Sequence, residues 1–288
     1  MDYVILTDSS ADLPWALYRE LDIPFVPFNI NVGGENRFDD ESFTPAELYG
    51  TLRGGVVATT SQVTPEAFKD FFTPRLREGK DIFYAGLASG LSATYESACA
   101  ARDELAPLYP ASRIEVVDSA SVTLGLGILL HRLARLRDAG APFEALREYV
   151  ERNKNNINHL FTVNDLMFLQ RGGRVSKTSA VVGSLLGIKP MLHVTPEGKL
   201  KNHGKVRGRR QSLVALAEEA SACAVGTELE YVMLAHGDCE EDMLVTLEEM
   251  KKRFTINHIV TRNLGATIGA HSGPGTVALF FEGKPRME

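Results

Sequence analysis

The stretch DIFYAGLASGLS (residues 81–92) indicates how this chain folds. Residues Asp81–Ala85 are mostly apolar and have the length of a buried strand, and a helical pattern follows them. Tyr3–Thr7 and Ile114–Val117 are further apolar runs of this kind, and each also precedes a helical pattern. Ile23–Val32 is extended, with two prolines that suggest an edge strand. Strands that alternate with helices predict a mostly parallel sheet with helices on both faces.

The pattern changes after the polar run Arg152–Asn156, and we place a domain boundary near residue 155. Strands are expected at His159–Val163, Ile188–Val194, 229–235, 256–260 and 276–281, with helices near 164–170, 176–186, 211–223 and 239–253. The expected fold class is therefore α/β in two domains. Residues 1–155 would form the domain with the mostly parallel sheet, and residues 156–288 a second domain closer to α+β, with a ligand between them.

The composition is that of an ordinary globular protein: 288 residues, 44% apolar and 24% charged. A net charge of -6 argues against a general nucleic-acid binder and against binding to an anionic membrane surface. The three cysteines are scattered without metal-ligand spacing, so reduced thiols and no zinc site are expected. The longest uncharged stretch, 263–281, holds a proline and four glycines and is unsuited to a membrane helix. The N-terminus lacks the pattern of a signal peptide, so a cytoplasmic protein is expected.

Hydroxyl side chains follow four of the apolar runs in the first half: Asp8-Ser9-Ser10, Thr59-Thr60-Ser61, Ser89-Gly90-Leu91-Ser92 and Asp118-Ser119-Ala120-Ser121. Ligands of open α/β sheets bind beyond the carboxyl ends of the strands, where helix N-termini offer free N–H groups. If the four groups converge, they would make a site for a carboxylate or a phosphate. The alternative is that each hydroxyl only caps its own helix.

The second half supplies cations and further apolar segments. Six of the twelve residues from Lys199 to Arg210 are Lys or Arg, which is typical of a solvated hairpin, although one arginine could turn inward to pair with a carboxylate. His271 lies in a glycine-rich loop, where the backbone can approach a ligand closely. The helix over about 121–139 and the segment 181–188 are apolar over much of their surface. They are expected to be buried core or the wall of an apolar pocket.

Together these segments resemble the DegV family, bacterial two-domain proteins that bind fatty acids. The resemblance covers essentially the whole chain and rests on eight motifs in order: Thr7-Asp8-Ser9-Ser10, Thr60-Ser61-Gln62, Ser89–Tyr95, Asp118-Ser119, Arg171-Gly172-Gly173-Arg174, Ile188-Lys189-Pro190, Lys205-Val206-Arg207-Gly208 and His271–Gly275. It implies a carrier rather than an enzyme. A long-chain fatty acid would lie buried in a tunnel between the domains, and a separate ATP-dependent fatty acid kinase would phosphorylate its carboxylate to an acyl phosphate.

The resemblance also assigns residues to the carboxylate site. Thr60 and Ser92 resemble the hydroxyls that hold the carboxylate, and Arg207 and His271 resemble its cationic partners. Ser61 and Ser119 are possible additional members. The resemblance implies no catalytic residue, no metal and no cofactor apart from the bound fatty acid. Ala93 departs from the glycine that is frequent in the family, and its methyl group could narrow the pocket beside Ser92.

Two other functions stay open from the residues alone. Ser92 and His271, with Asp8 or Asp118, could form the triad of an acyl hydrolase, which would cleave esters slowly. The segment Lys199–Arg210 could contact nucleic acid, but it lacks interleaved aromatic residues. On the carrier hypothesis, Arg209 and Arg210 in this segment would instead dock an acidic kinase.

Overall fold

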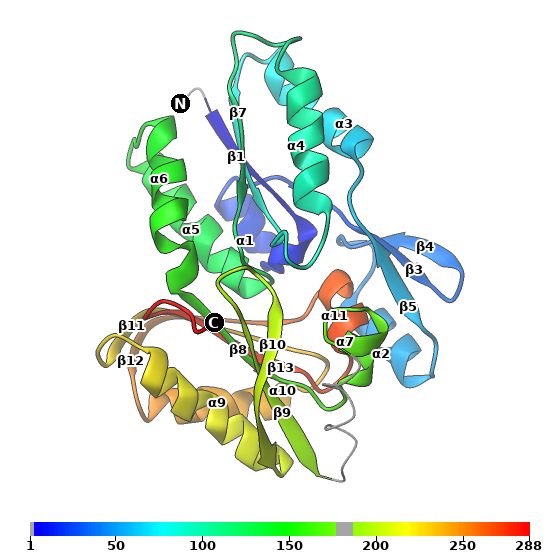
Figure 1. The fold of residues 1–288 in the computed structure, drawn as a ribbon, viewed down its shortest axis with the longest axis vertical. Helices are drawn as coiled ribbons and strands as arrows, with labels where there is room; N and C mark the ends of the chain where they lie inside the picture. Colours follow the sequence, from blue (N-terminus) through cyan, green and yellow to red (C-terminus); the bar gives the residue numbers. More distant parts are fainter. Residues whose placement is uncertain (1–2, 177–186) are drawn as a thin grey trace.

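The computed structural model describes residues 3–176 and 187–288, and its first sheet is parallel throughout. The order is β2-β1-β6-β7, with bounds β1 (Tyr3–Asp8), β2 (Phe25–Val26), β6 (Asp81–Gly86) and β7 (Ile114–Asp118). The predicted parallel sheet is confirmed. In Figure 1 it stands above the second sheet, with α3 (Pro65–Arg77) and α4 (Thr94–Leu105) beside it.

The second sheet has six strands in the order β10-β9-β8-β13-β11-β12. All neighbouring pairs are antiparallel except β11 and β12, so the sheet is mixed. Its strands are β8 (Ile157–Thr162), β9 (Ile188–Val194), β10 (Leu200–Arg207), β11 (Glu228–His236), β12 (Thr255–Asn263) and β13 (Val277–Glu282). This arrangement confirms the α/β class and the α+β character expected of the second half.

The remaining helices are α1 (Trp15–Glu20), α2 (Pro45–Arg53), α5 (Leu124–Asp138), α6 (Phe143–Asn153), α7 (Met167–Arg171), α9 (Arg209–Cys223), α10 (Glu240–Lys251) and α11 (Ala266–Ser272), with short 3-10 turns η1 (Ser9–Ala11) and η2 (Lys154–Asn156). The helix predicted at 176–186 lies almost wholly outside the described residues, as does most of the apolar segment 181–188. Within 3–176 and 187–288, no helix combines the length and apolar character needed to span a bilayer.

A third, antiparallel sheet corrects one expectation. It consists of β3 (Asn29–Val32), β4 (Glu35–Phe38) and β5 (Ala58–Ser61), with β3 in the centre. We expected the three hydroxyl residues Thr59–Ser61 to follow a strand of the parallel sheet. They lie instead within β5 of the third sheet. The segment 23–32 is extended as predicted, and β2 lies at the edge of the parallel sheet. It is interrupted between Val26 and Asn29, and β3 joins the third sheet instead.

Helix α5 joins the two large sheets into one packed body. Its residues are buried over most of its circumference, and it contacts β8, β11 and β13 of the mixed sheet. One cluster of buried side chains runs from β1 and β6 through α5 to these strands. The predicted boundary near residue 155 falls in η2, between α6 and β8. That residues 1–155 and 156–288 are separate domains stays a prediction.

Candidate functional site

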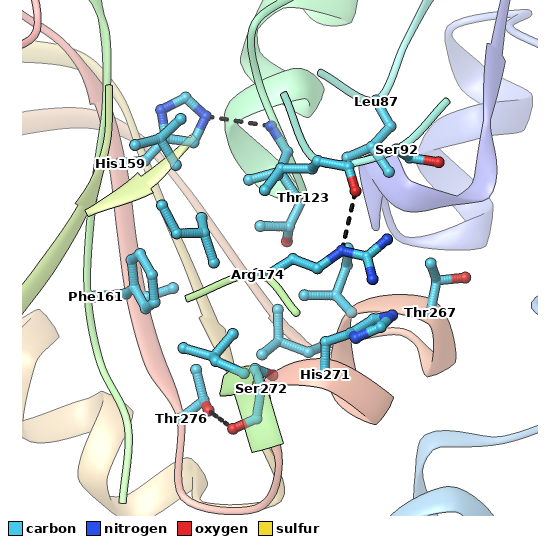
Figure 2. Close-up of a pocket in the computed structure, with 18 of the residues that line it drawn as sticks. Leu87, Ser92, Thr123, His159, Phe161, Arg174, Thr267, His271, Ser272 and Thr276 are labelled. Atoms are coloured by element: carbon cyan, nitrogen blue, oxygen red, sulfur yellow. Dashed lines mark hydrogen bonds between the residues drawn. The ribbon is translucent and has the colours of Figure 1, made fainter. Parts of the chain in front are cut away.

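A cavity lies where the parallel sheet faces the mixed sheet. Its walls are mainly apolar and come from both halves of the chain, for example from Leu87, Val122, Phe161, Val194, Ala278 and Phe280. Figure 2 shows polar side chains from several elements along the same space, among them Ser92, Arg174 and His271. An apolar cavity with a few convergent polar groups suits an apolar ligand with a polar end.

The structure brings Thr60 and His271 together, although 211 residues separate them in the chain. Thr60 lies on β5, and its Oγ1 is 2.7 Å from Nε2 of His271 on α11. Both residues line the cavity. Burial, with a smaller contribution from the charge of Arg174, lowers the pKa of His271 to about 4. The imidazole is therefore neutral at pH 7 and takes part in this pair as a hydrogen-bonding group, not as a cation.

Two aspartates from the first half of the chain hold the start of α11. The Asp39 carboxylate accepts hydrogen bonds from the backbone N–H groups of Ala266 (3.0 Å) and Thr267 (3.1 Å), and Asp12 accepts one from Gly265 (3.0 Å). The unpaired N–H groups of a helix N-terminus stabilise an acceptor such as the Asp39 carboxylate. Burial, together with the charge of Asp39, raises the pKa of Asp12 to about 8, so Asp12 accepts its hydrogen bond mostly as a neutral acid at pH 7. These contacts fix α11, and His271 with it, against the N-terminal half of the protein.

Arg174 supplies the guanidinium of the site, and the sequence analysis did not assign it this role. Helix α7 ends in a Schellman motif: Gly173, with φ of 74°, donates to Gln170, and Arg174 donates to Leu169 through its backbone N–H. The motif turns the chain back, so that the Arg174 side chain lines the cavity. Its Nε donates to the Leu91 carbonyl at 3.0 Å, and another nitrogen donates to Gly172. Burial lowers the pKa of Arg174 from its ordinary, very high value.

The other predicted hydroxyls occupy three different environments. Ser92 lines the cavity, and its Oγ lies 2.9 Å from the Thr94 hydroxyl. Ser61 is exposed, because successive side chains of β5 point to opposite faces and its neighbour Thr60 takes the inner one. Ser119 is buried but donates to the Gly86 carbonyl at 2.5 Å, so it ties the ends of β6 and β7 together. Neither Ser61 nor Ser119 is among the described residues that line the cavity.

Arg207 is likewise not among the described residues that line the cavity. It is the last residue of β10, the outer strand of the mixed sheet, and its side chain is exposed. Inner and outer side chains alternate along this strand, and Arg207 falls on the outer set together with Lys201 and Lys205. The structure therefore does not bring this arginine to Thr60 and His271.

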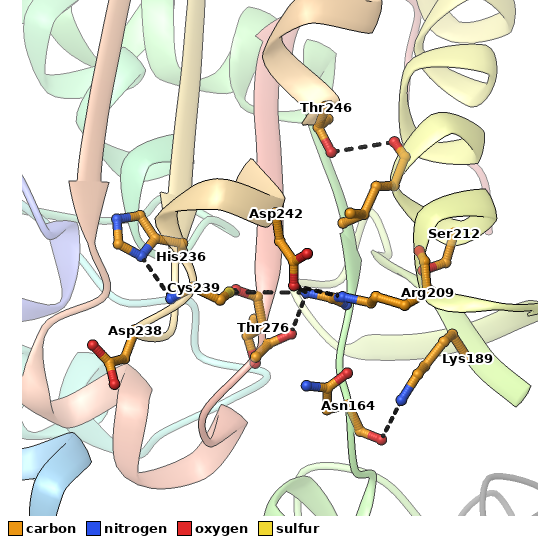
Figure 3. A network of polar contacts seen from close by, with 12 residues as sticks. Asn164, Lys189, Arg209, Ser212, His236, Asp238, Cys239, Asp242, Thr246 and Thr276 are labelled. Atoms are coloured by element: carbon orange, nitrogen blue, oxygen red, sulfur yellow. Dashed lines mark hydrogen bonds and ion pairs between the residues drawn. The ribbon is translucent and has the colours of Figure 1, made fainter. Parts of the chain in front are cut away.

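Arg209 differs from its neighbours in the basic segment because it is held inside a polar network. Its guanidinium donates to Asp242 at 2.9 Å and to the Gly275 carbonyl at 2.7 Å (Figure 3). Arg210, by contrast, is exposed. Of the two arginines expected to dock a partner, only Arg210 can be changed without disturbing the loop that follows α11.

An outer hollow adjoins the cavity at the polar end. It shares Thr60, Arg174 and His271 with the cavity, and Arg171 borders it as well. The Thr60–His271 pair thus stands between the apolar space and the outer hollow. A carboxylate placed against this pair would have its chain in the cavity and an oxygen toward the hollow.

The contacts of Ser92 and His271 do not form a hydrolase triad. Across residues 3–176 and 187–288, no hydrogen bond joins these two side chains, since each has its hydroxyl partner on another element. The two carboxylates considered for the triad accept hydrogen bonds from other side chains. Asp8 accepts them from the hydroxyls of Ser10 and Tyr84, and Asp118 accepts one from the hydroxyl of Ser89. The same described residues contain no cluster of three or more His, Cys, Asp or Glu side chains suited to a metal ion.

The lowered pKa of His271 predicts an acid-sensitive site in the ligand-free protein. Its folded pKa of about 4 lies below the ordinary value of 6.5, so the unfolded chain takes up a proton first as the pH falls. The stability contribution is complete above pH 6.5 and is lost between pH 6.5 and about 4. We expect a histidine ¹⁵N resonance that titrates near pH 4 and disappears in His271→Gln, whose unfolding free energy should fall less over this range. Titration of that resonance near pH 6.5 would contradict the buried site.

The chain is similar in sequence and in fold to known proteins of one family. A family model described as "Uncharacterised protein, DegV family" matches residues 2–284. A DegV domain-containing protein of Clostridium perfringens is 38% identical over 283 residues, which cover 98% of this chain and 97% of the relative. The structure of a DegV family protein from Thermus thermophilus, described for its fatty acid binding, is 30% identical. Its TM-score is 0.90, with 98% of this chain and 100% of that chain covered.

The Streptococcus pneumoniae Fatty Acid Kinase (Fak) B3 protein, solved with linoleic acid, has the same fold. Its TM-score is 0.85 at 24% identity, with 98% of this chain and 99% of that chain covered.

Proposed function

Because the chain belongs to the DegV family, we propose that it binds a long-chain fatty acid in the cavity between its two large sheets and presents the carboxylate to a separate fatty acid kinase. The observation that carries this proposal is the cavity itself. Its apolar walls come from both halves of the chain, and at one side it meets Thr60, Arg174 and His271, which also face the outer hollow.

The apolar wall would supply the affinity. A chain of ~15 methylenes at roughly 0.8 kcal/mol each offers about 12 kcal/mol of favourable burial. The loss of translational freedom and the ordering of the chain oppose much of this. The polar end would contribute less to affinity but would determine which way round the ligand binds.

The carboxylate would be held by Thr60, Ser92, Arg174 and His271. A buried carboxylate must be paired or hydrogen-bonded, since otherwise it would take up a proton. Arg174 can supply the positive charge and the hydroxyls of Thr60 and Ser92 the hydrogen bonds, with neutral His271 orienting Thr60. Arg174 thus takes the role that the family resemblance assigned to Arg207. The exposure of Arg207 instead suits contact with a partner.

The chemical step would belong to the kinase, and this chain would have no catalytic residue of its own. A carboxylate oxygen would attack the γ-phosphorus of ATP, the bond to ADP would break, and an acyl phosphate would form. The kinase would reach the carboxylate through the outer hollow, because the hollow borders the Thr60–His271 pair. Arg171 and Arg174 also line the hollow, and their positive charges would stabilise the added negative charge of the acyl phosphate. Arg207 and Arg210, both exposed, are the basic residues we propose for docking the kinase.

The proposal includes the setting in which the protein works. We place it in the cytoplasm, with no metal and no cofactor besides the bound fatty acid. We assign residues 1–155 to a domain that carries Thr60 and Ser92, and residues 156–288 to a domain that closes the lipid pocket. Nucleic acid is not among the proposed partners, because the basic residues of β10 lie in a chain of net charge -6 and without interleaved aromatic side chains.

The proposed partnership is tested by trapping the product with hydroxylamine, which converts an acyl phosphate to a hydroxamate. We expect hydroxamate only when this protein, hexadecanoic acid, ATP and a fatty acid kinase are all present. Replacing hexadecanoic acid with hexadecanol should abolish the product, since the alcohol has no carboxylate. Fatty acid binding without any hydroxamate would reject the kinase partnership but keep the carrier. Release of acid from an ester by this protein alone would favour the hydrolase.

A further inference from the structure

Three hydroxyl groups on the cavity wall have no hydrogen-bond partner in the part of the chain that the structure describes, those of Thr123, Thr267 and Ser272, and the last two lie on α11 beside His271. Thr267 and Ser272 both line the cavity from α11, and their side chains are 2% and 5% exposed. Their Oγ atoms are buried and make no hydrogen bond within residues 3–176 and 187–288. A buried hydroxyl without a hydrogen-bond partner destabilises the complex by about 1–3 kcal/mol. A ligand with a polar group at this position would therefore bind more tightly than a plain hydrocarbon chain, which cannot supply the hydrogen bond.

Most of the other polar side chains around the cavity already have partners. Thr60 is bonded to His271, Ser92 to Thr94, Arg174 to Leu91, Thr276 to the carbonyls of Ser272 and Gly273, and His159 to Ile157. The hydroxyl of Thr123, at the start of α5, has no hydrogen-bond partner among the described residues. Thr267 and Ser272 share this free hydrogen-bonding capacity with Thr123 and differ from it in lying on α11, the helix that carries His271.

Their place on α11 locates these hydroxyls along the bound chain. Thr267 lies four residues before His271, on the same face of the helix and about 6 Å away along its axis. Ser272 is the residue after His271. If the carboxylate binds at the Thr60–His271 pair, both hydroxyls would lie nearer to the carboxylate than to the methyl end of the chain.

We propose that the site selects fatty acids with a hydroxyl group near the carboxylate, of which 3-hydroxy acids are the simplest class. This inference rests on the proposed function and names its substrate class more closely. The ligand hydroxyl would form a hydrogen bond with Thr267 or with Ser272, which lie five residues apart on α11 and therefore face different parts of the bound chain. An unsubstituted chain leaves both hydroxyls to water or without a partner. Since both side chains project from one rigid helix, they would also distinguish the two enantiomers of such an acid.

The test is competition binding to delipidated protein. We expect one enantiomer of 3-hydroxyhexadecanoic acid to bind about fivefold or more tightly than hexadecanoic acid, the factor that one recovered hydrogen bond supplies. The other enantiomer should gain less. 16-Hydroxyhexadecanoic acid, with its hydroxyl at the apolar end of the cavity, should bind more weakly than hexadecanoic acid. Thr267→Val or Ser272→Ala, whichever removes the hydroxyl that meets the ligand, should reduce the preference. Both variants should keep the affinity for hexadecanoic acid, which also shows that they fold.

Thr162→Val is the matched control. Thr162 is also fully buried with an unpartnered hydroxyl among the described residues, but it follows Phe161 on β8 and points away from the cavity. This variant should keep the full preference. Equal affinity for 3-hydroxyhexadecanoic and hexadecanoic acid, or a preference that survives both α11 variants, would overturn the inference and leave fatty acid binding intact. Failure to bind hexadecanoic acid at all would reject the proposed function, and this inference with it.

Discussion

Asp39→Ala should lower the midpoint of thermal unfolding by on the order of 6–12 °C, which corresponds to about 3 kcal/mol for a chain of this size. Asp39 is 3% exposed, and its carboxylate accepts hydrogen bonds from the N–H groups of Ala266 and Thr267 and from the Ser9 hydroxyl. Alanine would leave these three buried donors without an acceptor. The loss should be largest in α11, so amide hydrogen exchange over 266–272 should become faster than in the rest of the protein.

Asp40→Ala is the matched control for this prediction. Asp40 is the next residue and also accepts two hydrogen bonds, but both come from Ser42 in an exposed turn. Its removal should shift the midpoint by no more than about 2–4 °C, as expected for a loss of about 1 kcal/mol. Equal shifts for Asp39→Ala and Asp40→Ala would contradict the view that Asp39 holds α11 in place.

Arg174→Met should weaken fatty acid binding about 100-fold, the second large effect that we expect. Methionine preserves much of the aliphatic stem and removes the guanidinium, so a carboxylate placed against Thr60 would lose its charge partner. A charge-assisted hydrogen bond to a buried group accounts for about 2–3 kcal/mol, or a factor near 100. Titration of delipidated protein with hexadecanoic acid and with hexadecanol separates the contribution of the guanidinium charge from that of the shape of the cavity. Only the affinity for the acid should fall, because the alcohol has no carboxylate.

Arg171→Met provides the comparison, because Arg171 borders the outer hollow and is not among the described residues of the cavity wall. We expect its affinity for hexadecanoic acid to stay within about threefold of the wild-type value, since an exposed charge contributes little. If Arg174→Met weakens binding of the acid and the alcohol equally, the arginine acts on the shape of the cavity and not on the carboxylate.

Local patterns were sufficient to predict most strands of the two large sheets, most helices and much of the candidate site, but not β4, β5 or β10. Apolar runs such as Asp81–Ala85 and Ile188–Val194 become strands because their residues can be buried on both faces. Thr60, Ser92 and His271 were identified from motifs, and the structure places all three on the cavity wall. The motif that contains Arg174 was also recognised, but its role depends on the end of α7. The Schellman turn that directs the side chain inward needs the helix before it.

Other features depend on contacts between distant residues, which a single sequence does not reveal. The glycine-rich stretch around His271 was expected to be a loop, yet Ala266–Ser272 is a helix. Its N-terminus is capped by Asp12 and Asp39, more than 220 residues away in the chain. Arg207 was expected at the carboxylate because it is cationic and lies in a matching motif. Only the alternation of β10, an outer strand, shows that its side chain is exposed.

Native mass spectrometry of the purified protein, followed by solvent extraction of its ligand, tests the central claim most directly. We expect a near-stoichiometric adduct of about 250–290 Da, the mass of ~15 methylenes with a carboxyl group. Extraction would identify the acyl chain, including any hydroxyl near the carboxylate. A mass equal to that of the chain alone, unchanged after incubation with tetradecanoic to octadecanoic acids, would contradict fatty acid binding in this cavity.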